Sequence, residues 1–187
     1  SSTFGRIWVT TDGSAFDAGT AKGTNATGHM FLEFNPTCTY SVGVQVWKAN
    51  IVGHADYKDT NSTNMTFNIT SDLFVNISAP LSSKAVVKGH NITFRGNVTD
   101  ECATLNFVTG AAVWFNATNV SVGSSLQCAA VADDSSGYYN CTLNTSAMQF
   151  GRYNLTMNAT RLHYNDSFKN SVTSAFVVTS KPTVASA

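Results

Sequence analysis

Charged residues are scarce in this chain. They make up 12% of its 187 residues, against the usual quarter of a globular domain, and the formal net charge is zero. This neutral balance argues against nucleic acid or an anionic membrane surface as a partner. No apolar run is long enough to span a bilayer, so we expect no membrane insertion in this segment. No signal peptide is recognisable, and we interpret the chain as a mature secreted product or a segment of one.

Clustered catalytic or metal-ligating residues are also missing. The histidines stand alone in the sequence, at His29, His54, His90 and His163, and no Gly-x-Ser-x-Gly motif occurs. Two acidic doublets, Asp100 with Glu101 and Asp133 with Asp134, follow expected strands, where oxygen-rich loops sometimes bind calcium. Asp is an ordinary turn residue, however, and no loop of alternating carboxylates is present. We therefore predict no enzyme, no metal site and no cofactor.

Asn-x-Ser/Thr triplets, the acceptor motif for N-linked sugar, are present in large excess. They involve fourteen of the eighteen Asn, although a Ser and Thr content of about a quarter would give only about four by chance. The sequence thus predicts a densely N-glycosylated extracellular protein with covalent glycans. The candidate glycosylation sites are Asn25, Asn61, Asn64, Asn68, Asn76, Asn91, Asn97, Asn116, Asn119, Asn140, Asn144, Asn154, Asn158 and Asn165. A preference for Thr and turn-forming Asn in a β-rich chain is the alternative explanation.

The stretch "YNLTMNAT", residues 153–160, shows how strand and sequon combine. Apolar residues alternate with Asn and Thr, which is the pattern of a strand with one dry face. In an extended strand the acceptor Asn and its hydroxyl partner point the same way. We therefore expect outward strand positions such as Asn154 and Asn158 to carry glycan.

The four cysteines predict up to two disulfides in an extracellular protein. In "LQCAAVADDSSGYYNCTL" a two-residue turn at Asp134 and Ser135 would place Cys128 directly opposite Cys141, within disulfide reach across a hairpin. The competing choice pairs Cys102 with either of them, as in the sheet-linking bond of immunoglobulin domains. Cys38 would then stay alone or bridge to another segment.

Short alternating runs bounded by turn residues predict an all-β chain. From residue 72 we expect seven strands: "DLFVNIS", "HNITFRGNV", "AAVWFNA", "LQCAAVA", "GYYNCTLN", "RYNLTMNATRLHY" and "SVTSAFVVT". Seven strands in about 108 residues match an immunoglobulin-like sandwich. We expect it to span residues 72–180, with a tail or linker at 181–187.

Residues 1–71 offer only four clear strands and a possible fifth: "FGRIWVTT", "HMFLEFN", "YSVGVQVWKA" and "NMTFNIT". A sandwich normally needs about seven, so this short β unit is predicted to be incomplete. Its alternating faces, Val42, Val44 and Val46 on one run and Met30, Leu32 and Phe34 on the other, would stay partly uncovered. A strand from a neighbouring copy is the expected remedy, lent by "STFGRIWVTT" or "AFVVTSKPTVASA".

Three elements of the C-terminal unit resemble the immunoglobulin-like repeats of heavily N-glycosylated microbial, especially archaeal, cell-surface proteins. These elements are Pro80 in the first strand, "GNVTD" at 96–100 and "GRYNLT" at 151–156. "GYYNC" at 137–141 also matches the signature of true immunoglobulin domains. However, forty-six residues follow Cys141, too many for one final strand.

The resemblance implies a fold and a compartment and carries no activity. The resulting hypothesis is a structural subunit of an extracellular filament, sheath or surface layer, a homopolymer joined head to tail. A cell-surface adhesion or receptor module is the alternative.

Overall fold

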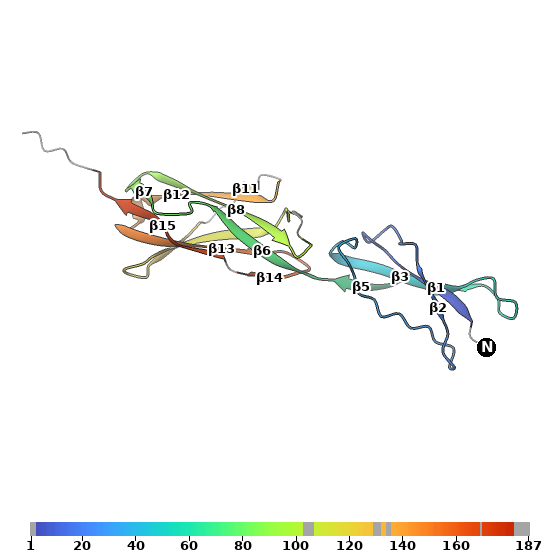
Figure 1. Cartoon of the computed structure of the whole chain (residues 1–187). Coiled ribbons are helices and arrows are strands. Elements are labelled where there is room, and N and C mark those ends of the chain that lie inside the picture. The colour runs from blue at the N-terminus through green and yellow to red at the C-terminus, as the bar shows by residue number, and fades with distance from the viewer. Residues whose placement is uncertain (1–2, 103–106, 129–131, 134–135, 169, 182–187) are drawn as a thin grey trace, which may run out of the picture. The chain divides into compact units, whose positions relative to one another are not determined.

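A computed structural model describes residues 3–102, 107–128, 132–133, 136–168 and 170–181 (Figure 1). The strands are β1 (Phe4–Val9), β2 (Thr20–Gly23), β3 (Gly43–Ile51), β4 (Thr60–Asn61), β5 (Met65–Ile69), β6 (Ser71–Ala79), β7 (Lys84–Val87), β8 (Asn91–Asp100), β9 (Ala112–Asn119), β10 (Ser125–Gln127), β11 (Ala132–Asp133), β12 (Tyr138–Asn144), β13 (Gly151–Thr160), β14 (Tyr164–Phe168) and β15 (Asn170–Thr179). The only helical element among these residues is a 3-10 turn, Thr145–Ala147. The predicted all-β class is confirmed.

The chain divides into two compact units, Ser1–Thr70 (unit 1) and Ser71–Ala187 (unit 2). The boundary expected from the sequence lies one residue later, after residue 71. Nothing helical in the described part of the chain has the length and apolarity that crossing a bilayer requires.

Unit 2 is a sandwich of two five-stranded sheets. The β8 sheet has the order β11-β12-β8-β6-β14, and the β9 sheet has the order β10-β9-β13-β15-β7. Alternate residues of each long strand face inward, so the core lies between the sheets. Its fully buried members include Leu73, Phe94, Phe115, Leu155 and Phe176. This is an immunoglobulin-like arrangement.

Two expected strands of unit 2 are each split between the sheets. "LQCAAVA" contributes β10 to the β9 sheet and Ala132 of β11 to the β8 sheet, with residues 129–131 outside the description. "RYNLTMNATRLHY" supplies β13 and, after a turn at 161–163, the start of β14, which runs parallel to β6 in the other sheet. β7 was not predicted; it follows Pro80 and pairs in parallel with β15. A short run that pairs at a sheet edge has too few residues to show a period of two.

Two tyrosine hydroxyls anchor loops of the sandwich. Tyr153, near the start of β13, donates a hydrogen bond to the Gln149 carbonyl oxygen at 2.9 Å. A tyrosine that bonds back to the backbone a few residues upstream is characteristic of immunoglobulin-like sandwiches. Tyr139 on β12 instead bonds residues far along the chain, donating to the Val108 carbonyl at 2.8 Å and accepting from the Ala111 amide at 3.0 Å. The tyrosine that bonds to the backbone just upstream is therefore Tyr153 of "GRYNLT", and not Tyr139 of "GYYNC".

Unit 1 is built on a single sheet. Its order is β2-β1-β3-β4, with β5 also pairing with β3. The expected strand "HMFLEFN", residues 29–35, is wrong in one respect: its side chains alternate between half-buried and exposed, but it joins no sheet. The alternation of apolar and polar residues correctly predicted which side chains are half-buried. A β-ladder also requires a second strand alongside, which the pattern of one segment cannot show.

A buried polar side chain fixes the loops at one end of this sheet. Gln45 on β3 is fully buried, and its Oε1 accepts hydrogen bonds from the Thr10 hydroxyl at 2.7 Å and the Gly13 amide at 2.8 Å. Its Nε2 donates to the Ser41 carbonyl at 2.7 Å. Every polar atom of this side chain is engaged, as burial requires.

Candidate functional site

Unit 1 contains an apolar groove with a volume of about 590 Å³. Its floor is the face of the sheet formed by Ile7, Val9, Trp47, Phe67 and Ile69, and its other wall is the segment of residues 30–36. The sequon residue Asn68 and Thr70 lie at its rim. We call this site the unit 1 groove.

The segment over the groove packs on the sheet through alternate side chains. Phe34 makes edge-to-face contacts with Tyr40 and Phe67, with ring centroids 5.0 and 5.6 Å apart. Met30 lies so close to β1 that a Cβ on Gly5 would collide with it. Phe31, which lies between these contacts, lines the groove but leaves 78% of its surface exposed. The segment is therefore held to the sheet at both ends.

The backbone of this segment has no partner strand. Among the described residues, no hydrogen bond joins the backbone of residues 30–36 to any other group. The bonds nearest to it are made by Asn25, whose Oδ1 accepts from the Thr27 and His29 amides and thereby shapes the preceding turn. Seven residues of unpaired extended chain over an apolar cavity form an edge that a further β-strand can join.

The opposite face of the unit 1 sheet is also partly open. Val44 on β3 is 51% exposed, and Val46 and Val42 are half-buried. On the same face the Lys48 amine lies 4.3 Å from the ring centroid of Phe16. The uncovered valines match the expectation that a unit of this size leaves apolar surface exposed.

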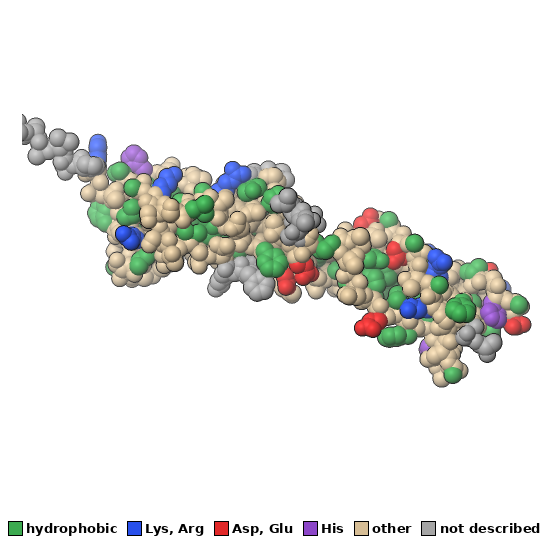
Figure 2. Space-filling model, viewed as in Figure 1, with side chains coloured by type: hydrophobic (Ala, Val, Ile, Leu, Met, Phe, Trp, Pro, Cys, Tyr) green, Lys and Arg blue, Asp and Glu red, His purple; other side chains and the backbone are tan. Residues whose placement is uncertain are grey.

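The fourteen sequon asparagines fall into three exposure classes. The exposed ones are Asn25, Asn61, Asn64, Asn68, Asn76, Asn91, Asn144 and Asn165; the half-buried ones are Asn97, Asn116, Asn140 and Asn154; and the buried ones are Asn119 and Asn158. The exposed class provides eight amides on the surface. Figure 2 shows few charged side chains on the face in view.

Asn158 faces outward as expected, but it is not exposed; that it carries glycan stays a prediction. Only 8% of its surface is accessible. β13 is the central strand of the β9 sheet, and the directly paired residue on β9 is Trp114. Neighbouring side chains on a central strand cover a short amide, and alternation alone does not reveal this.

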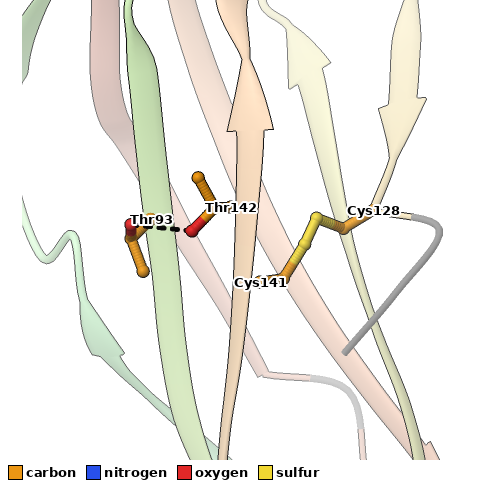
Figure 3. Close-up of a disulfide and its surroundings, with 4 residues drawn as sticks. All are labelled: Thr93, Cys128, Cys141 and Thr142. Atoms are coloured by element: carbon orange, nitrogen blue, oxygen red, sulfur yellow. Dashed lines mark hydrogen bonds between the residues drawn. A yellow bond between two sulfur atoms is a disulfide. The ribbon is translucent and has the colours of Figure 1, made fainter. Parts of the chain in front are cut away.

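Cys128 and Cys141 form a disulfide, with Cα atoms 6.3 Å apart (Figure 3). The predicted hairpin geometry is wrong: Cys128 follows β10 of the β9 sheet, whereas Cys141 lies on β12 of the β8 sheet. The bond therefore links the two sheets. The proposed turn at Asp134 and Ser135 lies outside the described residues. No cysteine is free in the described part of the chain.

Cys102 does not pair with Cys128 or Cys141, so the alternative connectivity is also wrong. The bond between the sheets that was expected for Cys102 is instead formed by Cys128 and Cys141. Facing strands of a sandwich lie close enough for such a bond, and the two cysteines are thirteen positions apart in the sequence.

Only one of the two acidic doublets, Asp100 with Glu101, has described side chains. Asp100 is buried and accepts a hydrogen bond from the Cys102 amide at 3.1 Å, while Glu101 is exposed. The side chains of Asp133 and Asp134 lie outside the description. No cluster of three His, Cys, Asp or Glu side chains occurs among the residues described.

Comparisons with known proteins bear on unit 2 most directly. Residues 74–157 match a family model described as a bacterial Ig domain. No curated protein sequence gave a significant match.

Solved structures with similar folds cover most of the chain at low identity. One is a tetra-tandem repeat from the extending region of a large adhesion protein, 16% identical over 90% of this chain and 40% of its own, with a TM-score of 0.48. Another is a structure of fibronectin(III)-like modules of Clostridium thermocellum CbhA, 14% identical over 96% of this chain and 80% of its own, with a TM-score of 0.40. A third is the S-layer protein SbsC, 16% identical over 92% of this chain and 24% of its own, with a TM-score of 0.39. The chain thus spans less than half the length of the first and third.

Proposed function

We propose that this chain is a structural subunit or repeat of an extracellular, densely N-glycosylated filament, sheath or surface layer. Its copies would join head to tail when a β-strand from one copy enters the unit 1 groove of the next. The observation that carries the proposal is the unpaired segment of residues 30–36, which lies over an apolar cavity.

A strand is the occupant that fits both features of this site. Its backbone would pair with the free amides and carbonyls of residues 30–36, and its alternate side chains would enter the cavity. A small apolar ligand would fill the cavity but leave the backbone edge unpaired. Each apolar side chain buried there would contribute about 1.5 to 3 kcal/mol, a large gain for a unit of 70 residues.

The two segments named as lenders from the sequence are mostly engaged within their own chain. β1, within "STFGRIWVTT", pairs with β2 and β3, and β15, which includes "AFVVT", pairs with β13 and β7. A copy that lent either strand would have to break these ladders. Ser180 and Lys181 follow β15 outside any strand, and the rest of the C-terminal lender, residues 182–187, lies outside the described residues.

Sequon density, low charge and the disulfide support the extracellular and glycosylated parts of the proposal. Eight sequon asparagines are exposed, and a surface with so few charges requires another source of hydration, which glycans supply. Disulfides persist in oxidising compartments. The bacterial Ig family match is consistent with a non-enzymatic repeat module.

The variant Glu33→Pro tests strand addition. Glu33 is exposed and its backbone amide has no partner in the isolated chain, so proline should barely change the folding of the monomer. It would nevertheless remove one ladder hydrogen bond with an incoming strand and disturb its register. The matched control Glu33→Ala keeps the amide and should assemble normally.

Assembly of the intact chain would be measured by sedimentation and electron microscopy, with circular dichroism to verify folding. A second variant, Leu32→Asp, places a charge in the groove wall and should also stop assembly. Normal polymers from both variants, or an intact chain that stays monomeric at high concentration, would rule out strand donation. A stable monomer would favour the adhesion or receptor module.

Glycosylation is tested separately by the intact mass of the native protein before and after deglycosylation. We expect the mass loss to correspond to about half or more of the sequons. A loss of fewer than about three glycans would exclude a dense coat, whatever the assembly experiment shows.

A further inference from the structure

The asparagines in these sequons are not chemically equivalent in the folded chain. N-linked sugar replaces one of the two hydrogens on the Asn amide nitrogen, Nδ2. The nitrogen must therefore reach solvent, and a hydrogen bond made through that hydrogen is lost. Two sequons of unit 2 fail these conditions.

Asn119 is the clearer of the two. It lies at the end of β9 on the inward side, in line with Val113, Phe115 and Ala117, and only 1% of its surface is exposed. Its Oδ1 accepts from the Ser121 amide at 2.9 Å and from the Val122 amide at 3.2 Å. These bonds shape the turn between β9 and β10.

The nitrogen of Asn119 is used as well. Nδ2 donates to the Phe150 carbonyl at 3.4 Å, which ties the β9–β10 turn to the residues just before β13. A sugar on this nitrogen would have to occupy the closed space between that turn and Phe150. The folded sandwich cannot hold it without opening this end of the structure.

Asn144 is exposed but fully engaged. Its Oδ1 accepts from the Ser146 amide at 2.9 Å and so begins the 3-10 turn. Both hydrogens of its Nδ2 are donated, to the Gly89 carbonyl at 3.1 Å and to Oδ1 of Asn91 at 2.9 Å. Glycosylation of Asn144 would break one of these bonds between β12 and the β7–β8 turn.

Other sequons of the same unit are unobstructed. Asn76, Asn91, Asn97 and Asn140 lie on the outer face of the β8 sheet, exposed or half-buried. Among the described residues, none of their amide nitrogens donates a hydrogen bond. Asn76 and Asn97 are directly paired across β6 and β8. This face therefore offers a group of acceptors on adjacent strands.

We propose that Asn119 and Asn144 are structural amides that stay unmodified, and that the outer face of the β8 sheet, at Asn76, Asn91, Asn97 and Asn140, carries the glycans of that sheet. The second part rests on the proposed function as a glycoprotein. The first part does not, because the hydrogen bonds of Asn119 and Asn144 hold whether or not any sugar is attached.

Paired substitutions separate a sequon from its asparagine. Ser121→Ala destroys the sequon of Asn119 but keeps its side chain, whereas Asn119→Ala removes both. We expect Ser121→Ala to leave the glycan mass and the melting temperature unchanged, and Asn119→Ala to lower the melting temperature by about 5 °C or more. Ser146→Ala and Asn144→Ala form the equivalent pair, with the same expected contrast.

Thr99→Ala, which destroys the sequon of Asn97, is the control for an occupied site and should remove one glycan. Glycopeptide mapping of the intact native protein would assign every position directly, even if Asn119→Ala failed to fold. Glycan found on Asn119 or Asn144 would overturn the proposal, as would equal melting temperatures within each pair. Absence of glycan from the whole protein would instead reject the proposed coat, while the contrast in melting temperature would still test the structural amides.

Discussion

Removal of the Cys128–Cys141 bond should destabilise unit 2 by an amount set by the loop it closes. The two cysteines are 13 residues apart in sequence. In the chain-entropy model a loop of this length restricts the unfolded chain by about 10 cal/mol/K, or about 3 kcal/mol at 25 °C. Reduction of the bond, which keeps both sulfur atoms, should cost this amount.

The double variant Cys128→Ala/Cys141→Ala should lose more. Both side chains are buried in the sandwich core, so removing two sulfur atoms adds about 1 to 2 kcal/mol to the cost of reduction. Urea denaturation followed by circular dichroism measures both effects. With a slope of about 1 to 3 kcal/mol/M, a loss of about 3 kcal/mol lowers the midpoint of the unit 2 transition by about 1 to 3 M.

A neighbouring substitution is the control. Thr142 follows Cys141 on the exposed side of β12, and its hydroxyl lies 3.0 Å from that of Thr93 (Figure 3). Thr142→Ser keeps the hydroxyl and the Asn140 sequon and should change stability by less than about 1 kcal/mol. Equal midpoints for the intact protein and the double variant Cys128→Ala/Cys141→Ala would refute the entropic reasoning. Recovery of a peptide with Cys102 linked to either cysteine would refute the connectivity.

Three further predictions concern single side chains. Gln45→Leu should destabilise unit 1 by about 2 to 5 kcal/mol in denaturant unfolding, because it leaves several buried polar groups unpaired; a loss below about 1 kcal/mol would contradict this. Gly96→Ala should cost about 1 to 3 kcal/mol in the same measurement, since its Cβ would lie 2.7 Å from the Asn76 carbonyl oxygen; unchanged stability would show that the strands can separate there. The hydrogen bond from the Tyr40 hydroxyl to Asp17 raises the pKa of Tyr40 above 10. The stability that this bond contributes is therefore fully present below pH 10, the pKa in the unfolded chain. It is lost as the pH rises through the higher pKa of the folded chain. Tyr40→Phe should therefore weaken the decline of unit 1 stability in this alkaline range, measured by denaturation at successive pH values; an identical decline would exclude the pair as its cause.

Part of the sequon pattern could have been predicted more fully from the sequence. Asn116 and Asn119 are three residues apart, an odd number, so on one strand they must face opposite sides. Since Val113, Phe115 and Ala117 share the parity of Asn119, the inward position of Asn119 follows from the alternation. The burial of Asn158 does not, because its parity is outward and alternation does not reveal its neighbours on the paired strand.

The sequence by itself determined the all-β class and the positions of the long strands, because a period of two is written locally in β6, β8, β9, β12, β13 and β15. The tertiary structure decided which strands became partners. It left residues 29–35 without a ladder, divided "LQCAAVA" between two sheets, and made Cys128–Cys141 a link between sheets instead of a hairpin bond. The physical reason is that side-chain direction depends on the backbone of a single segment, whereas hydrogen-bond and disulfide partners depend on segments that meet only in the folded chain.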